Sequence, residues 1–292
     1  MESCGGDRVA VRWAVVLGGG GVVGAAWMAG LAAELGRRGV ELGSADVIVG
    51  TSAGAIVGAA LVVGRDLDSF AEDPRPPGGA QPPVAVDVEL LTAAAAALFD
   101  RTAERDGLRR KACELAMAKE PAQPVHIAPM EWLVGGGEWP DDRLRVVVVD
   151  AAGGERQVWH RGSGVPLATA VTASRSFPGL FPPVVVADRY YIDGALWSPT
   201  NADVAPDSDL LLVIDPLAHR FPAEYLQSEL ATTKVTTLVR FGPDAATIDV
   251  FDAAATAPDP ITVWPTAFQA GVRQADDLAK QLLDAGWLAP QH

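Results

Sequence analysis

A Gly-Thr-Ser-Ala-Gly segment at residues 50–54 joins two apolar runs of different character. Residues 46–49 are short and β-branched toward their end, as in a buried strand, whereas residues 56–63 are Ala-rich and apolar on every side, as in a buried helix. This context predicts that Ser52 lies on a tight strand-to-helix turn, the pattern of a nucleophile elbow. At a helix N-terminus, backbone N–H groups and the helix dipole also favour negative charge. The alternative is that Ser52 only caps the helix.

A second glycine-rich segment lies between a predicted strand and a predicted helix. Residues 19–24 fit the G-x-G-x-x-G pattern of dinucleotide binding, and Asp46 lies about where a ribose-binding acid is expected. The same glycines can instead donate N–H groups to the oxyanion of an acyl-transfer intermediate, which assigns Gly19, Gly20 and Gly21 to an oxyanion hole. The elbow favours this second interpretation, because an acyl-transfer enzyme needs both groups at the carboxyl edge of one sheet.

Two arrangements could supply a general base for Ser52. Asp193 begins Asp-Gly-Ala directly after a predicted strand, and Gly194 permits a turn that aims the carboxylate. A Ser-His-Asp triad would instead use Ser52, then Asp193 or Asp215, then His219, which is the chain order of the α/β-hydrolases. Taken alone, an Asp-Gly pair is more often an ordinary turn.

Four motifs, in this order, resemble those of the patatin-like phospholipases. They are the glycine loop at residues 19–24, the elbow at 50–54, the Ala-Ser…Pro…Phe-Pro-Pro block at 173–183 and Asp-Gly-Ala at 193–195. The resemblance spans about residues 12 to 215. It implies an α/β/α sandwich and a Ser–Asp dyad, without histidine, that hydrolyses acyl esters of lipids.

Carried onto this chain, the resemblance implies that Ser52 is the nucleophile, that Asp193 is its partner and that the glycine loop is the oxyanion hole. The implied substrate is a phospholipid, a lysophospholipid or a neutral acyl ester, cleaved at a carboxylic ester bond through an acyl-Ser52 intermediate. Many family members have Arg or Lys where Val23 stands, which weakens the inference to phospholipid. Arg175 either replaces that cation or is simply solvated. The remaining motif positions, which would support the site, are Gly24, Gly50, Gly54 and Gly194.

The rest of the chain indicates one α/β domain over residues 1–292, a three-layer α/β/α sandwich around a mostly parallel sheet. Residues 66–140 are interpreted either as a helical cap or insertion over the site, or as one more covering layer. Strands are expected over residues 11–17, 46–49, 144–150, 155–160, 184–186, 190–192 and 209–214, with weaker ones over 246–250 and 261–264. Helices are expected over residues 25–38, 56–63, 165–174, 223–240 and 266–283, with residues 87–119 as two helices broken near 106–107 and residues 121–140 without regular structure.

Composition limits the partners. The chain has 23 Lys plus Arg against 37 Asp plus Glu, a formal net charge of −14, and no basic block. This charge argues against nucleic acid as a partner and makes approach to an anionic membrane unfavourable. The expected partner is a lipid or acyl-ester substrate, with transient contact to a neutral or zwitterionic membrane or micelle surface. No spacing of His, Cys or carboxylates matches a metal site, and no cofactor is expected.

The cysteines and the N-terminal residues suggest a compartment. Cys4 and Cys113 are the two cysteines of the chain, which argues against a disulfide framework and for a reducing environment. Residues 1–12 lack a signal-peptide pattern, and the apolar stretches are too short for a membrane span. We therefore expect a cytoplasmic protein, peripheral at a membrane at most, whose oligomeric state the sequence leaves open.

Overall fold

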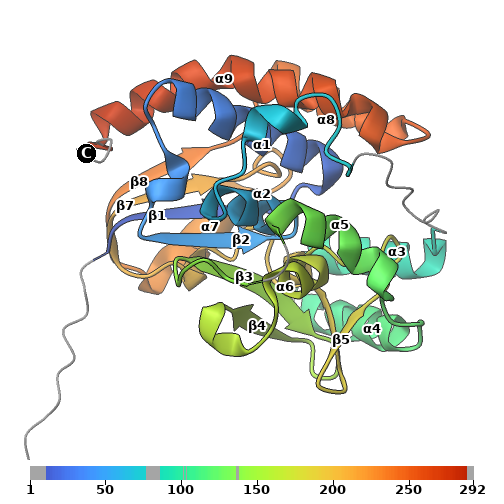
Figure 1. Ribbon diagram of the computed structural model, residues 1–292. Helices are drawn as coiled ribbons and strands as arrows, with labels where there is room; N and C mark the ends of the chain where they lie inside the picture. Colours follow the sequence, from blue (N-terminus) through green and yellow to red (C-terminus); the bar gives the residue numbers. More distant parts are fainter. Residues whose placement is uncertain (1–10, 77–85, 101, 103, 136–137, 288–292) are drawn as a thin grey trace, which may run out of the picture.

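The computed structural model describes residues 11–76, 86–100, 102, 104–135 and 138–287. Within these residues the chain forms one eight-stranded sheet in the order β5-β6-β3-β2-β1-β7-β8, with β4 also paired to β3 (Figure 1). The parallel strands are β1 (Val11–Leu17), β2 (Val47–Thr51), β3 (Leu144–Asp150), β7 (Ser208–Ile214) and β8 (Val235–Phe241). The antiparallel strands are β4 (Glu155–Trp159), β5 (Val184–Val186) and β6 (Arg189–Asp193).

Helices cover both faces of the sheet, so the expected three-layer α/β/α sandwich is confirmed. One face is covered by α1 (Gly21–Arg37), α2 (Ala53–Val62), α5 (Pro124–Val134), α6 (Leu167–Ser174), α8 (Ala245–Thr256) and α9 (Trp264–Asp284). The other face carries α7 (Ala223–Glu229). On the same side as α7, α3 (Val88–Phe99) and α4 (Arg105–Met117) pack against Val149 of β3 and Ile192 of β6.

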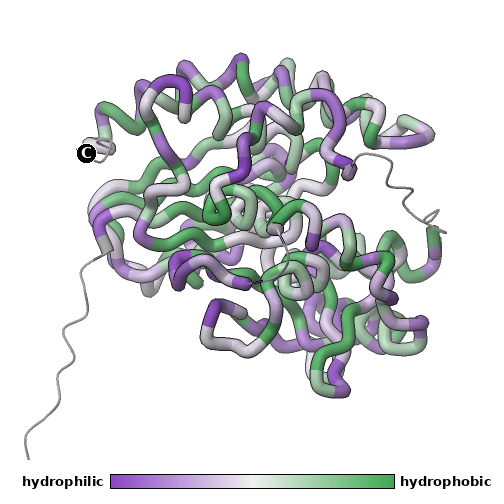
Figure 2. The backbone as a smooth tube through the Cα atoms, in the orientation of Figure 1, coloured by the Kyte–Doolittle hydropathy of each residue, from purple (hydrophilic) through white to green (hydrophobic). Residues whose placement is uncertain are grey.

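Alternation along the central strands divides the core between the two faces. In β1, Val15 and Leu17 pack with α1, α2 and α9, whereas Ala14 and Val16 pack on the opposite face with Leu226 of α7. Because both faces are covered, these strands are apolar along most of their length, as parallel strands generally are. Figure 2 shows the strands as the most hydrophobic part of the backbone trace.

One edge of β3 positions the site. Thr51, the last residue of β2, pairs with Val147, and Asp193, the last residue of β6, pairs with Val148. Since β4 pairs with the opposite edge of β3 at both positions, β2 and β6 follow one another along the same edge. The carboxyl end of β2 therefore meets the carboxyl end of β6, which brings Ser52 to Asp193 from far away in the sequence.

Three expectations for the C-terminal third are wrong. The helix expected over residues 223–240 ends at Glu229, and residues 235–241 form β8, whose Val-Thr-Thr-Leu-Val-Arg-Phe sequence is rich in β-branched residues. The weak strand expected over 246–250 lies inside α8, where the Asp244 carboxylate accepts the Thr247 N–H and caps the helix. The weak strand expected over 261–264 is a 3₁₀ turn that leads into α9.

The segment 66–140 also differs from expectation. Residues 121–140 contain α5, which begins at Pro124, a position where a missing backbone N–H costs nothing. The break between α3 and α4 lies before residue 106, because the Asp100 carboxylate accepts the Thr102 N–H in a turn. The helices α3 and α4 pack near Ile192 and Leu196, and α5 joins the main core. A single domain with a cap over 66–140 stays a prediction.

Candidate active site

Ser52 lies on the strand-to-helix turn between β2 and α2. Its backbone has φ 55° and ψ −115°, a left-handed φ that is uncommon for a residue other than glycine. A Cβ at Gly54 would lie 1.9 Å from the Leu17 carbonyl oxygen, and one at Gly50 would lie 2.6 Å from the Ala55 Cα. The two flanking glycines therefore let β1, β2 and α2 pack closely enough to hold the serine in this strained turn.

The Ser52 hydroxyl donates a hydrogen bond of 2.7 Å from Oγ to Oδ2 of Asp193. Asp193 is fully buried, and its other oxygen, Oδ1, accepts the Ala195 N–H at 2.8 Å. Burial raises the pKa of Asp193 to about 7, although the hydrogen bonds from Ala195 and Ser52 partly oppose the rise. A carboxylate with that pKa can accept a proton near neutral pH, where an ordinary aspartate is a poor base.

Ser174, at the end of α6, holds the backbone of Ser52. Its hydroxyl oxygen accepts the Ser52 N–H at 2.9 Å and donates to the Val147 carbonyl oxygen at 2.7 Å. All of these groups are buried, so the hydroxyl satisfies a donor and an acceptor that water cannot reach. The sequence offered one signal for this residue, its place in the Ala-Ser…Pro block, but no role.

The glycine loop faces Ser52, but it offers fewer free donors than expected. A Cβ at Gly19 would lie 3.6 Å from the Ser52 Cβ, so the two backbones are close. The Gly19 N–H, however, already donates to the Pro199 carbonyl oxygen at 2.7 Å. Within the described part of the chain, the N–H groups of Gly20 and Gly21 have no hydrogen-bond partner. Of the three glycines expected to donate, Gly20 and Gly21 at the start of α1 therefore have an unbonded N–H group among the described residues, whereas Gly19 does not.

The other two motif glycines lie where backbone or ring atoms approach closely. A Cβ at Gly194 would lie 2.5 Å from the Val147 carbonyl oxygen, so a side chain there would push β6 away from β3. A Cβ at Gly24 would lie 3.1 Å from Cβ of Pro216. Both positions allow close packing around the site rather than contact with a substrate.

Asn201 is a buried polar residue that the sequence analysis missed. It has a left-handed φ of 51°, and its side-chain N–H groups donate to the Ser198 carbonyl oxygen at 2.7 Å and to Thr51 Oγ1 at 3.1 Å. A longer contact of 3.3 Å reaches the Gly194 carbonyl oxygen. One amide thus connects the turn after Asp193 to the end of β2. No local sequence pattern indicates this role, because its partners are far away in the chain.

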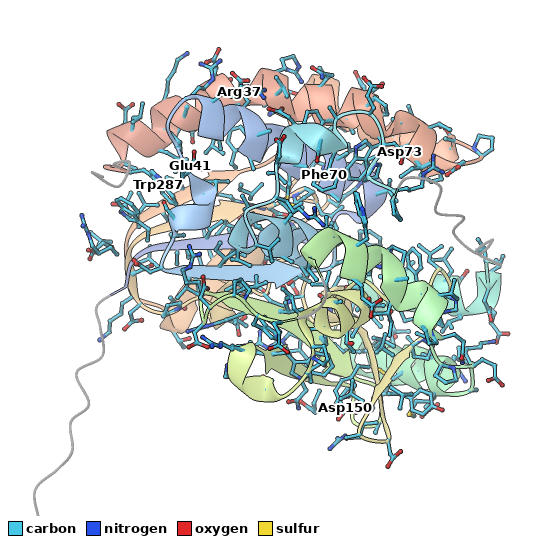
Figure 3. The ribbon with its side chains drawn as sticks, viewed as in Figure 1. Arg37, Glu41, Phe70, Asp73, Asp150 and Trp287 are labelled. Atoms are coloured by element: carbon cyan, nitrogen blue, oxygen red, sulfur yellow. The ribbon has the colours of Figure 1, made fainter. Side chains whose placement is uncertain are left out.

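A cavity of about 360 Å³ opens from the dyad. Ser52, Asp193 and the glycine loop line its polar end, and apolar side chains from α1, α2, α5, the 175–181 loop and the segment after α2 line the rest. Phe70, labelled in Figure 3, contributes from that last segment. Ile56, Val57 and Ala60 follow α2 away from Ser52, so the wall runs roughly 12 Å along this helix. The volume lies within the usual range for small-molecule sites.

Arg175 lines this cavity and is partly buried, so it is not the solvated loop residue that the sequence allowed. Its guanidinium carbon lies 4.6 Å from the centre of the Phe181 ring, and its Nε is buried without a hydrogen-bond partner. Burial lowers its pKa to about 10, which still leaves the side chain charged at neutral pH. Val23 does not line the cavity and packs against the hydrophobic core instead.

The alternative site residues lie apart from the dyad. The His219 Nε2 accepts a hydrogen bond from Arg220, and no described histidine bonds to Ser52 or Asp193. The Asp46 carboxylate accepts the backbone N–H groups of Arg12 and Trp13. Asp46 precedes β2 and therefore lies at the amino edge of the sheet, opposite the glycine loop, so the structure does not bring together the two parts of a dinucleotide site.

The described residues contain no group of three or more His, Cys, Asp or Glu side chains that could hold a metal ion. None of the helices formed by these residues combines the length and the apolar character needed to cross a bilayer.

A model of the patatin-like phospholipase family matches residues 15–206. No curated protein matches the chain in sequence. Among solved structures, VipD from Legionella pneumophila is 14% identical with a TM-score of 0.44, and the match covers 93% of this chain and 67% of VipD. A chain in the structure of full-length SpcU with full-length ExoU, from the type III secretion system of Pseudomonas aeruginosa, is 18% identical with a TM-score of 0.40. The match covers 95% of this chain and 53% of that chain. This chain therefore spans about half the length of that second match.

Proposed function

The chain belongs to the patatin-like phospholipase family, and on that basis we propose that it is a serine acyl hydrolase that cleaves carboxylic ester bonds of lipids. The observation that carries the proposal is the 2.7 Å hydrogen bond between Ser52 Oγ and Asp193 Oδ2 at the polar end of an apolar cavity. The substrate class is a phospholipid, a lysophospholipid or a neutral acyl ester. The family match supports lipid ester hydrolysis in general, and the geometry supports the choice of residues.

The proposed reaction has two steps. In the first, Asp193 accepts the Ser52 proton while Oγ attacks the ester carbonyl carbon, and the oxyanion that forms is bound by the N–H groups of Gly20 and Gly21. The C–O bond then breaks, and the leaving alcohol takes the proton from Asp193. In the second step, Asp193 deprotonates a water molecule that attacks the acyl-Ser52 carbonyl. The fatty acid leaves, and the proton returns to Ser52.

The same geometry supports a lipid as substrate and a brief contact with a lipid surface. The cavity walls are apolar and can hold an acyl tail, while the ester group reaches the polar end. Phe99 belongs to the cavity lining and is 44% exposed. Exposed apolar side chains beside a lipid-binding cavity suit contact with a neutral or zwitterionic interface. The net charge of −14 disfavours an anionic one.

Labelling with a fluorophosphonate tests the proposal, because this probe reacts with activated serines. We expect the wild-type protein to be labelled and to hydrolyse a p-nitrophenyl acyl ester, and Ser52→Ala to do neither. The matched control is His219→Ala, which we expect to keep both properties, since His219 makes no contact with the dyad. An unlabelled wild-type protein, or an inactive His219→Ala that is still folded by circular dichroism, would reject the proposed dyad.

A further inference from the structure

Arg175 is a cation in the cavity wall with no anionic partner among the described residues. The other arginine that lines the cavity, Arg75, forms an ion pair of 2.6 Å with Asp73, which Figure 3 labels at the segment after Phe70. No ion pair or side-chain hydrogen bond joins Arg175 to any described group, and its Nε is enclosed. The two arginines of one cavity therefore differ in that Asp73 compensates the charge of Arg75, whereas no described side chain compensates that of Arg175.

An uncompensated charge in an apolar environment is costly. Removing a guanidinium from water is unfavourable unless hydrogen bonds or an anion replace the lost hydration. The stacking of Arg175 on Phe181 offsets only part of this cost. A buried N–H without an acceptor adds to the cost. Since the fold itself supplies no anion, the remaining source is the molecule that fills the cavity.

The position of Arg175 limits where that anion can lie. Arg175 directly follows Ser174, whose hydroxyl accepts the Ser52 N–H. Its side chain shares the cavity with Ser52 and Gly20. An anion that meets this guanidinium therefore lies in the same cavity as the ester under attack. In a glycerophospholipid, the phosphate is separated from the acyl ester by only a few bonds. A guanidinium is also the side chain best suited to bind phosphate through two parallel hydrogen bonds.

We propose that Arg175 binds the phosphate of a glycerophospholipid or lysophospholipid substrate next to the scissile ester, and so selects phosphate-bearing lipids over neutral acyl esters. This inference rests on the proposed function, because it assigns a headgroup to the substrate of the same site. Arg175 is then a residue for substrate specificity, distinct from the dyad and from the two oxyanion donors. The walls of the cavity would bind the acyl tail of both kinds of ester equally.

Two substrates that differ only in the phosphate test the inference. 1-Hexanoylglycerol and 1-hexanoylglycerol-3-phosphate share the acyl chain and the ester, and a chain of this length keeps both monomeric, so no lipid surface is involved. In Arg175→Met, which keeps an unbranched apolar side chain, we expect kcat/KM for the phosphate ester to fall about 10- to 100-fold. For hexanoylglycerol we expect a change of less than about threefold. Arg175→Lys, which keeps the charge but not the planar fork, is expected to lie between the wild type and Arg175→Met for the phosphate ester.

The control and the contrary outcomes separate the inference from the proposed function. Arg110 is exposed on α4, so Arg110→Met removes one positive charge away from the cavity, and we expect it to leave the ratio of the two kcat/KM values unchanged. Equal losses on both esters in Arg175→Met would overturn the inference, because they would indicate a role in binding the oxyanion or in folding. An unchanged ratio in a variant that fluorophosphonate still labels would also overturn it while leaving the acyl hydrolase intact. Failure of the wild type to react with the probe or with either ester would instead reject the proposed function.

A free phosphate ion is the other source of the same chemistry. Inorganic phosphate at millimolar concentration, added to the hexanoylglycerol assay, tests for it. One outcome is that phosphate changes the rate of the wild type but not of Arg175→Met, while the wild type and Arg175→Met hydrolyse the phosphate ester equally well. The site then binds the free ion, and the headgroup assignment is overturned. If phosphate inhibits only weakly and the phosphate ester is preferred by the wild type alone, the headgroup assignment is supported.

Discussion

The two ends of the cavity are built in different ways. At the catalytic end, the buried polar side chains of Ser52, Ser174, Asp193 and Asn201 all have hydrogen-bond partners within the protein. Along the walls the side chains are apolar, and the charged group Arg175 has no such partner. The polar side chains at the catalytic end are thus paired without a ligand, whereas Arg175 in the wall is not.

This difference predicts how each end responds to substitution. A buried network fails when one member is removed, because the remaining partners stay buried and unsatisfied. An apolar wall loses only the contacts of the atoms that change, about 0.8 kcal/mol for each methylene group. We therefore expect large losses for all substrates at the catalytic end and small, substrate-dependent effects at the apolar positions of the walls.

The largest effect is expected for Asp193→Asn, which keeps the shape of the side chain and removes its basicity. The amide can still accept the Ala195 N–H and can donate to Ser52 Oγ, so the fold is retained. We expect kcat to fall about 10²- to 10⁴-fold, the usual contribution of a general base. Steady-state kinetics with a p-nitrophenyl ester measures this loss. A variant with more than half of the wild-type kcat would show that Asp193 is not the base.

A second prediction concerns pH, because the pKa of Asp193 is raised to about 7 by burial. The ionised carboxylate is the reactive form, so kcat/KM is expected to rise about tenfold per pH unit up to about 7 and then level off.

The free energy of unfolding changes with pH in the opposite direction. Between the pKa of an unfolded aspartate, about 3.9, and about 7, the folded state binds the extra proton, so the free energy of unfolding falls as pH rises.

Asp193→Asn provides the control for both pH effects. Since the amide does not ionise, we expect the variant to be more stable than the wild type at pH 8, by at most about 4 kcal/mol, and equally stable at pH 4. Urea unfolding at the two pH values measures the difference. An activity profile that is flat from pH 5 to 8 in the wild type would contradict the raised pKa.

Ser174→Ala is expected to have an intermediate effect. The substitution leaves the Ser52 N–H and the Val147 carbonyl oxygen buried without partners, at a cost of about 1–3 kcal/mol in stability. We expect kcat to fall about tenfold with little change in KM, because the nucleophile loses its fixed position. Ser176→Ala is the matched control, since Ser176 is equally buried and its hydroxyl bonds only to the Thr172 carbonyl oxygen, while the bond from the Asp193 N–H to its backbone carbonyl survives the substitution. Equal kcat values for the two variants would show that Ser174 has only a structural role.

The catalytic end of the cavity could be predicted from the sequence better than its walls. The elbow was predictable from its glycine-bounded motif at a strand end. The contact between Ser52 and Asp193 was predicted through the family resemblance, since β6 runs antiparallel to β3 and the shared edge of parallel strands does not place its end. The bond from Gly19 to Pro199 and the role of Asn201 were not predictable, since they join loops far apart in the chain. The walls were predicted least well. A helix in the wall, α5, begins with a proline that suggested a loop, and the burial of Arg175 depends on how the 175–181 loop packs.

The smallest effect is expected at the far wall, where Ala60 lies roughly 12 Å along α2 from Ser52. In Ala60→Leu the longer side chain occupies cavity volume, so the end of a long acyl tail is displaced while a short tail is unaffected. Returning about one methylene to water costs about 0.8 kcal/mol, which corresponds to a roughly fourfold lower kcat/KM for a dodecanoyl ester. We expect the butanoyl ester to be hydrolysed at the wild-type rate, and the ratio of the two esters gives the measurement. Equal losses of kcat/KM on both esters would mean that the acyl tail does not follow α2. The substitution would then lower activity by disturbing Ser52 and Asp193 rather than by displacing the substrate.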